Sequence, residues 1–215
     1  MSAVAAATAG ATAGATAGAT AAPVLEVFAD GACERNGSRA ARGAFAVFVA
    51  DSHPENLARV VPSMRAAAAP VTNQLVELLA CVAAAEVGRR ARTAAAARGE
   101  PPPFVALYTD SMYAVKCVTQ WAAAWDRNGW RTKDGKPVKH AVLVRRLREL
   151  LAESGAKIAH VRAHQPAPPH GAPARARRLW YGNMRADEAA RCALRGGERD
   201  RLAGALRGGD KMARP

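Results

Sequence analysis

Short apolar runs separated by turn signals mark the first sixty residues of the chain. Val24–Ala29 and Gly43–Ala50 are two such runs. The Asn36-Gly37 dipeptide between them is typical of a hairpin turn, so the pattern predicts a pair of strands. A third strand is predicted over Leu57–Met64. The chain is therefore expected to begin as a sheet.

The next segment changes to helical periodicity. Thr72 or Asn73 can cap a helix here with its side chain. Glu77 then lies in the first turns of that helix. The apolar positions that keep helical spacing are Leu75, Val76, Leu78, Leu79, Val82 and Val87.

Strands and helices alternate in the rest of the chain. Phe104–Tyr108 follows three prolines and is predicted as a buried strand, with Ser111 opening the next helix. A helix is expected over Val142–Leu151, a strand over Lys157–Val161, and a final helix from near Asn183 after a loop rich in Pro and Arg. The predicted order is β-β-β-α-β-α-α-β-α, which is an α/β fold.

The two ends of the chain differ in composition from the segment between them. Residues 1–22 carry no charge and repeat Ala-Thr-Ala-Gly, so they lack the large side chains that offset the cost of ordering a backbone. We expect a disordered tail over 1–22, one folded domain over 23–196 and a basic, flexible tail over 197–215.

Neither a secretory signal nor a transit peptide is evident at the N-terminus. No run is apolar enough to span a bilayer. The four cysteines form no Cys-x-x-Cys pair, so neither a zinc ribbon nor a disulfide framework is predicted. We expect a monomeric intracellular protein without membrane contact.

The charge balance favours an anionic partner. The chain has 31 Lys and Arg against 18 Asp and Glu, a net charge of +13. Such a surface attracts polyanions, above all nucleic acid, although a high arginine content can also follow from GC-rich coding.

Four acidic residues occupy distinctive positions in this basic chain. Asp30 and Asp110 are predicted at strand ends, Glu77 near a helix start, and Asp187 in the final helix. Carboxylates are the ligands that Mg²⁺ takes in proteins, and a magnesium site facing a polyanion suits phosphodiester chemistry. Any of the acids could be an ordinary helix cap or a solvated charge, and for Asp110 or Glu77 taken alone that is the better explanation, whereas the four together favour a metal site.

The chain resembles the type 1 ribonuclease H family, specifically the catalytic domain of cellular RNase H1, over Val24 to Leu194. Each matching segment is a weak signal alone, but all six occur in the family's order. They are Asp30-Gly31-Ala32-Cys33 with Asn36-Gly37, Thr72-Asn73-Gln74 with Glu77, Tyr108–Met112, Trp121–Trp130, Ala163-His164, and Gly182-Asn183 with Ala186-Asp187. The resemblance implies an RNase H-like fold, with a five-stranded mixed sheet flanked by helices.

The resemblance also implies an activity and its cofactor. The enzyme would hydrolyse the RNA strand of RNA–DNA hybrids by a two-metal-ion mechanism, leaving 5′-phosphate and 3′-hydroxyl ends. Two Mg²⁺ ions, for which Mn²⁺ can substitute, would be held by the four acids. Asp30 would bridge both ions, Glu77 and Asp110 would hold the ion nearer the leaving group, and Asp187 the ion nearer the nucleophilic water.

By the same resemblance, His164 stands where the family has a mobile histidine that assists proton transfer or product release. An imidazole titrates near neutrality, which suits this role. However, 17 residues separate His164 from Gly182, where the family usually has only a few. His170 lies in this 165–181 insertion and is the alternative.

Nucleic-acid contacts are implied at several further positions. Three amide residues would sense the ribose 2′-hydroxyl, although Asn36 also suits a turn and Asn73 a helix cap. Thr72 matches a DNA-phosphate pocket that departs from the family's usual residues at Pro70 and His140. Aromatic residues would pack on the DNA strand, and arginines of the insertion would compensate for the altered pocket. The full set is Asn36, Thr72, Asn73, Gln74, Tyr113, Trp121, Trp125, Arg175, Arg177 and Arg178.

Two other functions compete with this hypothesis. A hybrid-binding protein without catalysis would keep the basic groove, but the presence of all four acids argues against it. A junction resolvase, integrase or 3′–5′ exonuclease also uses clustered acids. The Trp121–Trp130 segment and the Thr72-Asn73-Gln74 setting favour ribonuclease H over these nucleases.

Overall fold

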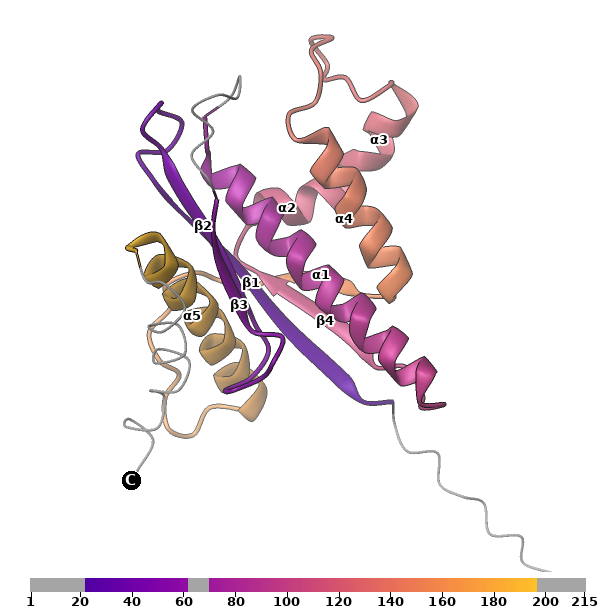
Figure 1. Cartoon of the computed structure of the whole chain (residues 1–215), viewed down its shortest axis with the longest axis vertical. Helices are drawn as coiled ribbons and strands as arrows, with labels where there is room; N and C mark the ends of the chain where they lie inside the picture. The colour runs from indigo at the N-terminus through magenta and orange to yellow at the C-terminus, as the bar shows by residue number, and fades with distance from the viewer. Residues whose placement is uncertain (1–21, 62–69, 197–215) are drawn as a thin grey trace, which may run out of the picture.

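The computed structural model of the chain describes residues 22–61 and 70–196. Within these residues, one mixed sheet has helices on both faces (Figure 1). Its strands are β1 (Val24–Glu34), β2 (Arg42–Phe48), β3 (Leu57–Val61), β4 (Phe104–Thr109) and β5 (Lys157–His160). The helices are α1 (Asn73–Ala97), α2 (Met112–Lys116), the π-helical turn η1 (Cys117–Trp121), α3 (Ala122–Arg127), α4 (Ala141–Ser154) and α5 (Ala174–Leu194). The predicted fold class is confirmed.

The strand order in the sheet is β3-β2-β1-β4-β5. β1 pairs antiparallel with β2 and parallel with β4, so it lies at the centre. The parallel pairing with β4 ends at Ala29 and Thr109. Asp30 directly follows Ala29, and Asp110 directly follows Thr109. Two of the four acids therefore lie at the same edge of the sheet.

The first strand extends further than its apolar run predicts. Asp30 is expected at a strand end, but β1 continues to Glu34 because these residues stay paired with β2, in a register that sets Asp30 opposite Ala46. The prediction that Asp30 ends the strand is therefore wrong. Only the parallel pairing of β1 with β4 ends next to Asp30.

Helices cover the two faces of the sheet unequally. α1 and α4 lie on one face and α5 alone on the other (Figure 1). Successive β1 residues point to opposite faces. Val27 and Ala29 accordingly belong to the core beneath α1, whereas Phe28 packs on the α5 side.

The final helix begins well before the predicted position. α5 starts at Ala174, not near Asn183. The prolines of the insertion suggest an irregular loop, but the last of them, Pro173, is the residue just before the helix, where a missing N–H costs nothing. The 165–181 insertion is thus a loop followed by two extra turns of α5.

This correction changes the setting of the three arginines expected to bind phosphate. All three are helical. Arg178 donates to Glu26 at 3.0 Å and to the backbone oxygen of Val49, which fastens α5 to the sheet. Arg177 donates to the backbone oxygen of Ala172. Arg175 is exposed.

The predictions for the two tails and for the end of the third strand fall mostly on residues that the structure does not describe. The predicted tails, 1–22 and 197–215, lie outside the described residues apart from position 22, as do positions 62–64 of the predicted third strand. None of the described helices combines the length and the apolar character needed to cross a membrane.

Candidate metal centre and active site

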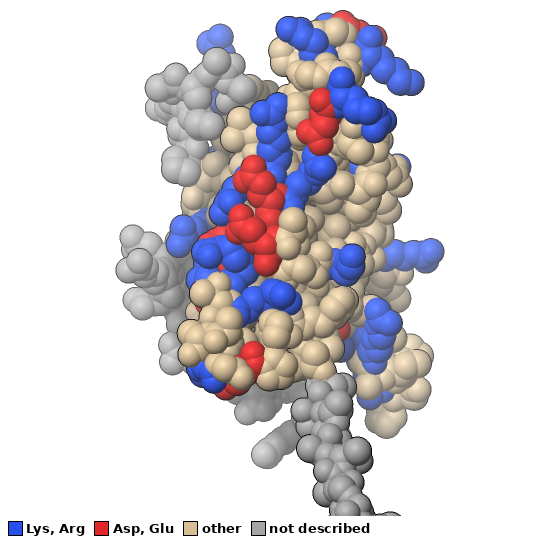
Figure 2. All heavy atoms as spheres, turned by 90° about the vertical axis from the view of Figure 1, so that its right-hand side faces the viewer, with Lys and Arg blue, Asp and Glu red and all other residues tan. Residues whose placement is uncertain are grey.

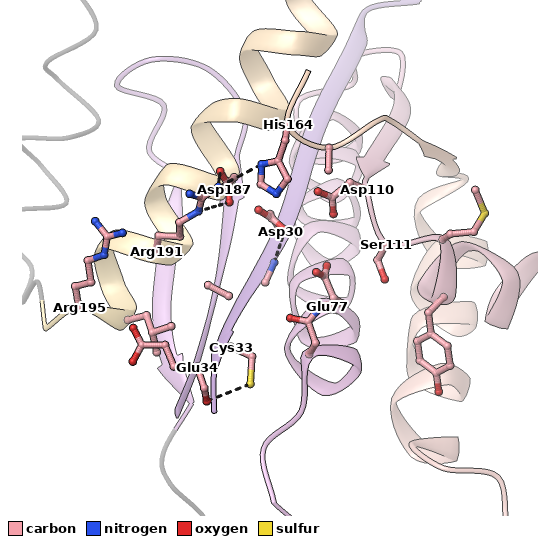
Figure 3. A pocket seen from close by; sticks show the side chains of 17 residues that line it. Asp30, Cys33, Glu34, Glu77, Asp110, Ser111, His164, Asp187, Arg191 and Arg195 are labelled. Carbon is pink, nitrogen blue, oxygen red and sulfur yellow. Dashed lines mark hydrogen bonds and ion pairs between the residues drawn. The ribbon is translucent and has the colours of Figure 1, made fainter. Parts of the chain in front are cut away.

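Three carboxylates meet at the sheet edge where the β1–β4 pairing ends. Asp30 comes from β1, Glu77 from α1 and Asp110 from the residue after β4. Each offers an oxygen, and these oxygens lie within 4.8 Å of one another. Figure 3 shows the three side chains converging. The sequence prediction that they share one site is consistent with this geometry.

Gly31 allows α1 to approach the sheet closely enough for this convergence. A Cβ at Gly31 would lie 2.7 Å from the carbonyl carbon of Val76 and 2.8 Å from the nitrogen of Glu77. No side chain fits in that space. The Gly31 N–H also donates to Asp30 Oδ1 at 2.8 Å, which orients that carboxylate.

Burial and mutual repulsion make the cluster electrostatically strained. Asp30 is 4% exposed and Glu77 is 6% exposed. Burial, followed by the charges of Asp30, Asp110 and Asp187, raises the pKa of Glu77 to about 10. Burial and the charges of Asp110 and Asp187 raise the pKa of Asp30 well above its usual range. Carboxylates arranged in this way call for a cation between them.

The metal-free protein should therefore lose stability as pH rises. The pKa of Glu77 in the folded protein lies above its value of 4.5 in the unfolded chain. The contribution of Glu77 to stability is therefore complete below pH 4.5 and is lost as the pH rises toward about 10. Urea unfolding in EDTA should give a lower free energy of unfolding at about pH 8 than at about pH 5. Glu77→Gln should make the free energy of unfolding depend less on pH. The same dependence on pH in this variant and in the wild type would contradict the claim that the buried Glu77 carboxylate destabilises the metal-free protein.

Asp187 reaches the same cavity from α5 but has a different partner. Arg191, one turn later, donates to both of its oxygens, with Nε 2.7 Å from Oδ1. The charge of Asp187 also acts on Asp30 and, after burial and the charge of Asp110, raises the pKa of that carboxyl. Asp187 is therefore adjacent to the three clustered acids without belonging to their 4.8 Å group.

His164 lies beside Asp187 and faces the cavity (Figure 3). Its Nδ1 is 3.4 Å from Arg191 Nη2. The alternative, His170, is exposed and does not line this cavity. Among the two histidines, the geometry places His164 beside the acids.

The sequence reasoning assigned no role to two residues of this site. Asn183 is buried beside Asp110, where its side chain opposes the rise in the pKa of Asp110 that burial causes, and Arg191 donates to Asp187. They lie four residues before and four residues after Asp187. That spacing puts them on one helix face and is the signal that could have identified them.

The cavity beside the cluster has a volume of about 700 Å³. Its donors suit a hard divalent cation, because the converging ligands are all carboxylate oxygens. Glu77 Oε2 is buried and has no hydrogen-bond partner among the described residues, as expected for an atom that a metal ion would use. The acids that line the cavity, together with the two basic side chains beside Asp187, are Asp30, Glu77, Asp110, Asp187, His164 and Arg191.

Known proteins with similar sequences decide the family. The ribonuclease H family model matches residues 22–195. The chain is 30% identical over 175 residues to Ribonuclease H of Nitrosococcus oceani, an alignment that covers 81% of this chain and 97% of that protein. The chain belongs to the ribonuclease H family.

Further relatives agree with a type 1 ribonuclease H. Ribonuclease H1 of Rattus norvegicus is 31% identical over 139 residues, which are 64% of this chain and 43% of that protein. The solved structure of LC9-RNase H1, a type 1 RNase H with the type 2 active-site motif, has a TM-score of 0.55 and 21% identity, covering 87% of this chain and 86% of that one. The resemblance read from the six segments is confirmed, and with it the expectation of a ribonuclease H enzyme.

The residues expected to sense ribose lie where the β1–β2 turn meets α1 of this ribonuclease H. Asn36 Oδ1 accepts a hydrogen bond from the Asn73 N–H at 2.9 Å, and the Gly37 N–H donates to Val71 O at 3.1 Å. Gln74 is exposed beside them. The turn and the helix start are thus fastened together, and Asn73 also lines the cavity.

Thr72, rather than Asn73, caps α1. Its Oγ1 accepts from the Leu75 N–H at 3.3 Å, so this oxygen already has a partner. Pro70 is exposed just before it. His140, the other departure in the implied phosphate pocket, begins α4 in a left-handed conformation with φ 60°.

A row of aromatic rings leads away from the cavity toward α3. Tyr113 lines the cavity, and its ring centroid is 6.1 Å from that of Trp121. The row continues through Trp125 to Trp130, each step 5.8 Å. Trp121 is 36% exposed, whereas Trp130 is 8% exposed and donates to Asp126. The row therefore runs from solvent into the core, so its outer members are free to meet a ligand.

The face formed by α3 and α4 carries both signs of charge (Figure 2). There Arg146 pairs with Glu86, Glu149 and Glu153, and Arg148 pairs with Asp126. Paired charges attract a polyanion less than unpaired ones.

Proposed function

We propose that this ribonuclease H is an endonuclease that hydrolyses the RNA strand of RNA–DNA hybrids with two divalent cations, Mg²⁺ or Mn²⁺, leaving 5′-phosphate and 3′-hydroxyl ends. The observation that carries the proposal is the convergence of Asp30, Glu77 and Asp110 in an open cavity. The names of the relatives support the substrate, since a solved relative of the same fold is a foamy viral protease-reverse transcriptase in complex with an RNA/DNA hybrid.

The four acids are proposed to hold the cations. Asp30, the most central, would contact both ions, with Glu77 and Asp110 on one and Asp187 on the other. Bound cations would polarise the scissile phosphate and lower the pKa of an attacking water. The chain's part is to fix the carboxylates: the Gly31 N–H donates to Asp30, and Asn183 of α5 lies beside Asp110.

Two residues are proposed to act around the cations. Arg191 neutralises Asp187 in the metal-free protein, and the second cation would take over that role. His164, which faces the cavity beside Asp187, would exchange a proton with the reacting groups.

The duplex is proposed to lie across the cavity, with its RNA strand at the turn–helix junction and its DNA strand along the aromatic row. Asn36, Asn73 and Gln74 would meet ribose, and Tyr113, Trp121 and Trp125 would pack on the DNA. Thr72 and Arg175 are proposed phosphate contacts. Arg178 is already fastened to Glu26 and is left out of this set.

A hybrid whose RNA strand contains a short run of deoxyribonucleotides tests the ribose contacts. Cleavage is expected to stop within the run, because the amide residues lose their 2′-hydroxyl partners there, and to continue on either side. Products mapped on a sequencing gel give the cut sites, and an all-RNA strand of the same sequence is the control. Cuts spread evenly through the deoxyribonucleotide run would contradict the proposal.

A further inference from the structure

The loop between β5 and α5 holds His164 in an unusual backbone conformation. Its φ is 49°, in the left-handed region that residues with a Cβ rarely adopt. Such a conformation persists only where the surroundings enforce it. The contacts of the loop should therefore reveal what enforces it.

Trp180 provides the contact that joins this loop to the extra turns of α5. Its indole Nε1 donates to the backbone oxygen of Gln165 at 2.9 Å. The Gln165 side chain in turn donates to the backbone oxygen of Ala163 at 3.0 Å. The residues on both sides of His164 are thus held by one chain of hydrogen bonds that ends at Trp180.

The part of α5 that carries Trp180 is itself fastened to the sheet. The Tyr181 hydroxyl lies 3.0 Å from both carboxylate oxygens of Asp51. Arg178, in the turn of α5 before Tyr181, pairs with Glu26, with Nε 3.0 Å from Oε2. These contacts hold the first turns of α5 against β1 and the turn after β2, so Trp180 is a fixed point for the loop.

We propose that Trp180 is a positioning residue for His164: the extra turns of α5, Ala174–Tyr181, are a brace that holds the histidine loop over the acidic cluster. Trp180 acts through Gln165 and does not itself touch the substrate. This inference rests on the proposed function for its catalytic consequence, while the brace itself is a property of the free protein.

Trp180→Phe tests the brace without any substrate, because it keeps an aromatic ring and removes the N–H donor. Backbone NMR order parameters of residues 163–165 should fall in the variant, and the His164 ring signals should broaden or shift. Trp130→Phe is the matched control, since it also removes an indole N–H donor, here to Asp126, at a place outside the loop and outside α5. Unchanged loop order in Trp180→Phe would overturn the proposal.

A double-mutant cycle tests the catalytic consequence. With saturating hybrid, Trp180→Phe should lower kcat on the order of 10-fold with little change in KM, because misplacing a catalytic group costs rate rather than binding. In a His164→Ala background the same substitution should have no further effect. An equal loss in both backgrounds would show that Trp180 does not act through His164.

The two arms separate this inference from the proposed function. If the wild-type protein fails to cleave hybrid, the proposed function is wrong, and the NMR comparison alone still decides whether Trp180 holds the loop. If the wild type cleaves but the loop order and the cycle show no link to Trp180, only the brace is wrong.

Discussion

Asp110→Asn is expected to lower the rate of hybrid hydrolysis by about 10³-fold or more, because a metal site supplies several kcal/mol of transition-state stabilisation and each 1.4 kcal/mol is a factor of about ten. The substitution removes one charge from the cluster while preserving side-chain size. It should leave the fold intact, and metal-free Asp110→Asn should be at least as stable as the wild type, since burial and repulsion already raise the pKa of Asp110. Single-turnover kinetics and thermal unfolding measure the two effects.

Glu188→Gln is the matched control for this experiment. Glu188 follows Asp187 on α5, is exposed, and lies 4.0 Å from Arg185 rather than in the cluster. Its neutralisation removes the same formal charge from the same neighbourhood and should leave hydrolysis almost unchanged. Full activity in Asp110→Asn, or an equal loss in both variants, would contradict the assignment of Asp110 to the metal centre.

Gly182→Ala should produce the largest loss of stability among conservative changes in α5. A Cβ at this position would lie 2.3–2.4 Å from three ring carbons of Phe28, which is fully buried. Overpacking of this severity costs about 3 kcal/mol, which exceeds the about 1 kcal/mol that Ala gains over Gly within a helix. Displacement of α5 should also reduce activity, because Asn183 and Asp187 move with it.

Gly171→Ala is the control for this prediction, because nothing lies within 4 Å of its added Cβ. It should change the free energy of unfolding by less than about 0.5 kcal/mol. Urea unfolding of both variants checks the pair. Equal stabilities would show that α5 does not pack on Phe28 as closely as described.

The positions of Glu77 and Asp110 follow from short local patterns in the sequence. Thr72 caps α1 and Ser111 caps α2, so Glu77 and Asp110 fall at predictable distances from element starts. Asp30 was expected at a strand end, yet β1 continues, because strand length depends on pairing with β2 rather than on apolar residues.

The start of α5 could not be predicted from local signals alone. A proline-rich stretch indicates a loop, and only tertiary contacts decide that the last proline begins a helix. The contacts of Arg178 with Glu26 and of Trp180 with Gln165 span 152 and 15 positions. Long-range contacts of this kind leave no periodic trace in the sequence. The position of Arg191, by contrast, follows from helical spacing once Asp187 is placed.

A cleavage assay on matched duplexes tests the central claim most directly. RNA–DNA, RNA–RNA and DNA–DNA duplexes of one sequence are incubated with the wild-type protein in Mg²⁺ and in EDTA, and the ends of the products are identified. Cleavage of only the RNA strand of the hybrid, only with Mg²⁺, and with 5′-phosphate and 3′-hydroxyl ends is the predicted result. Equal cleavage of the DNA duplex, or hydrolysis that persists in EDTA, would contradict the account.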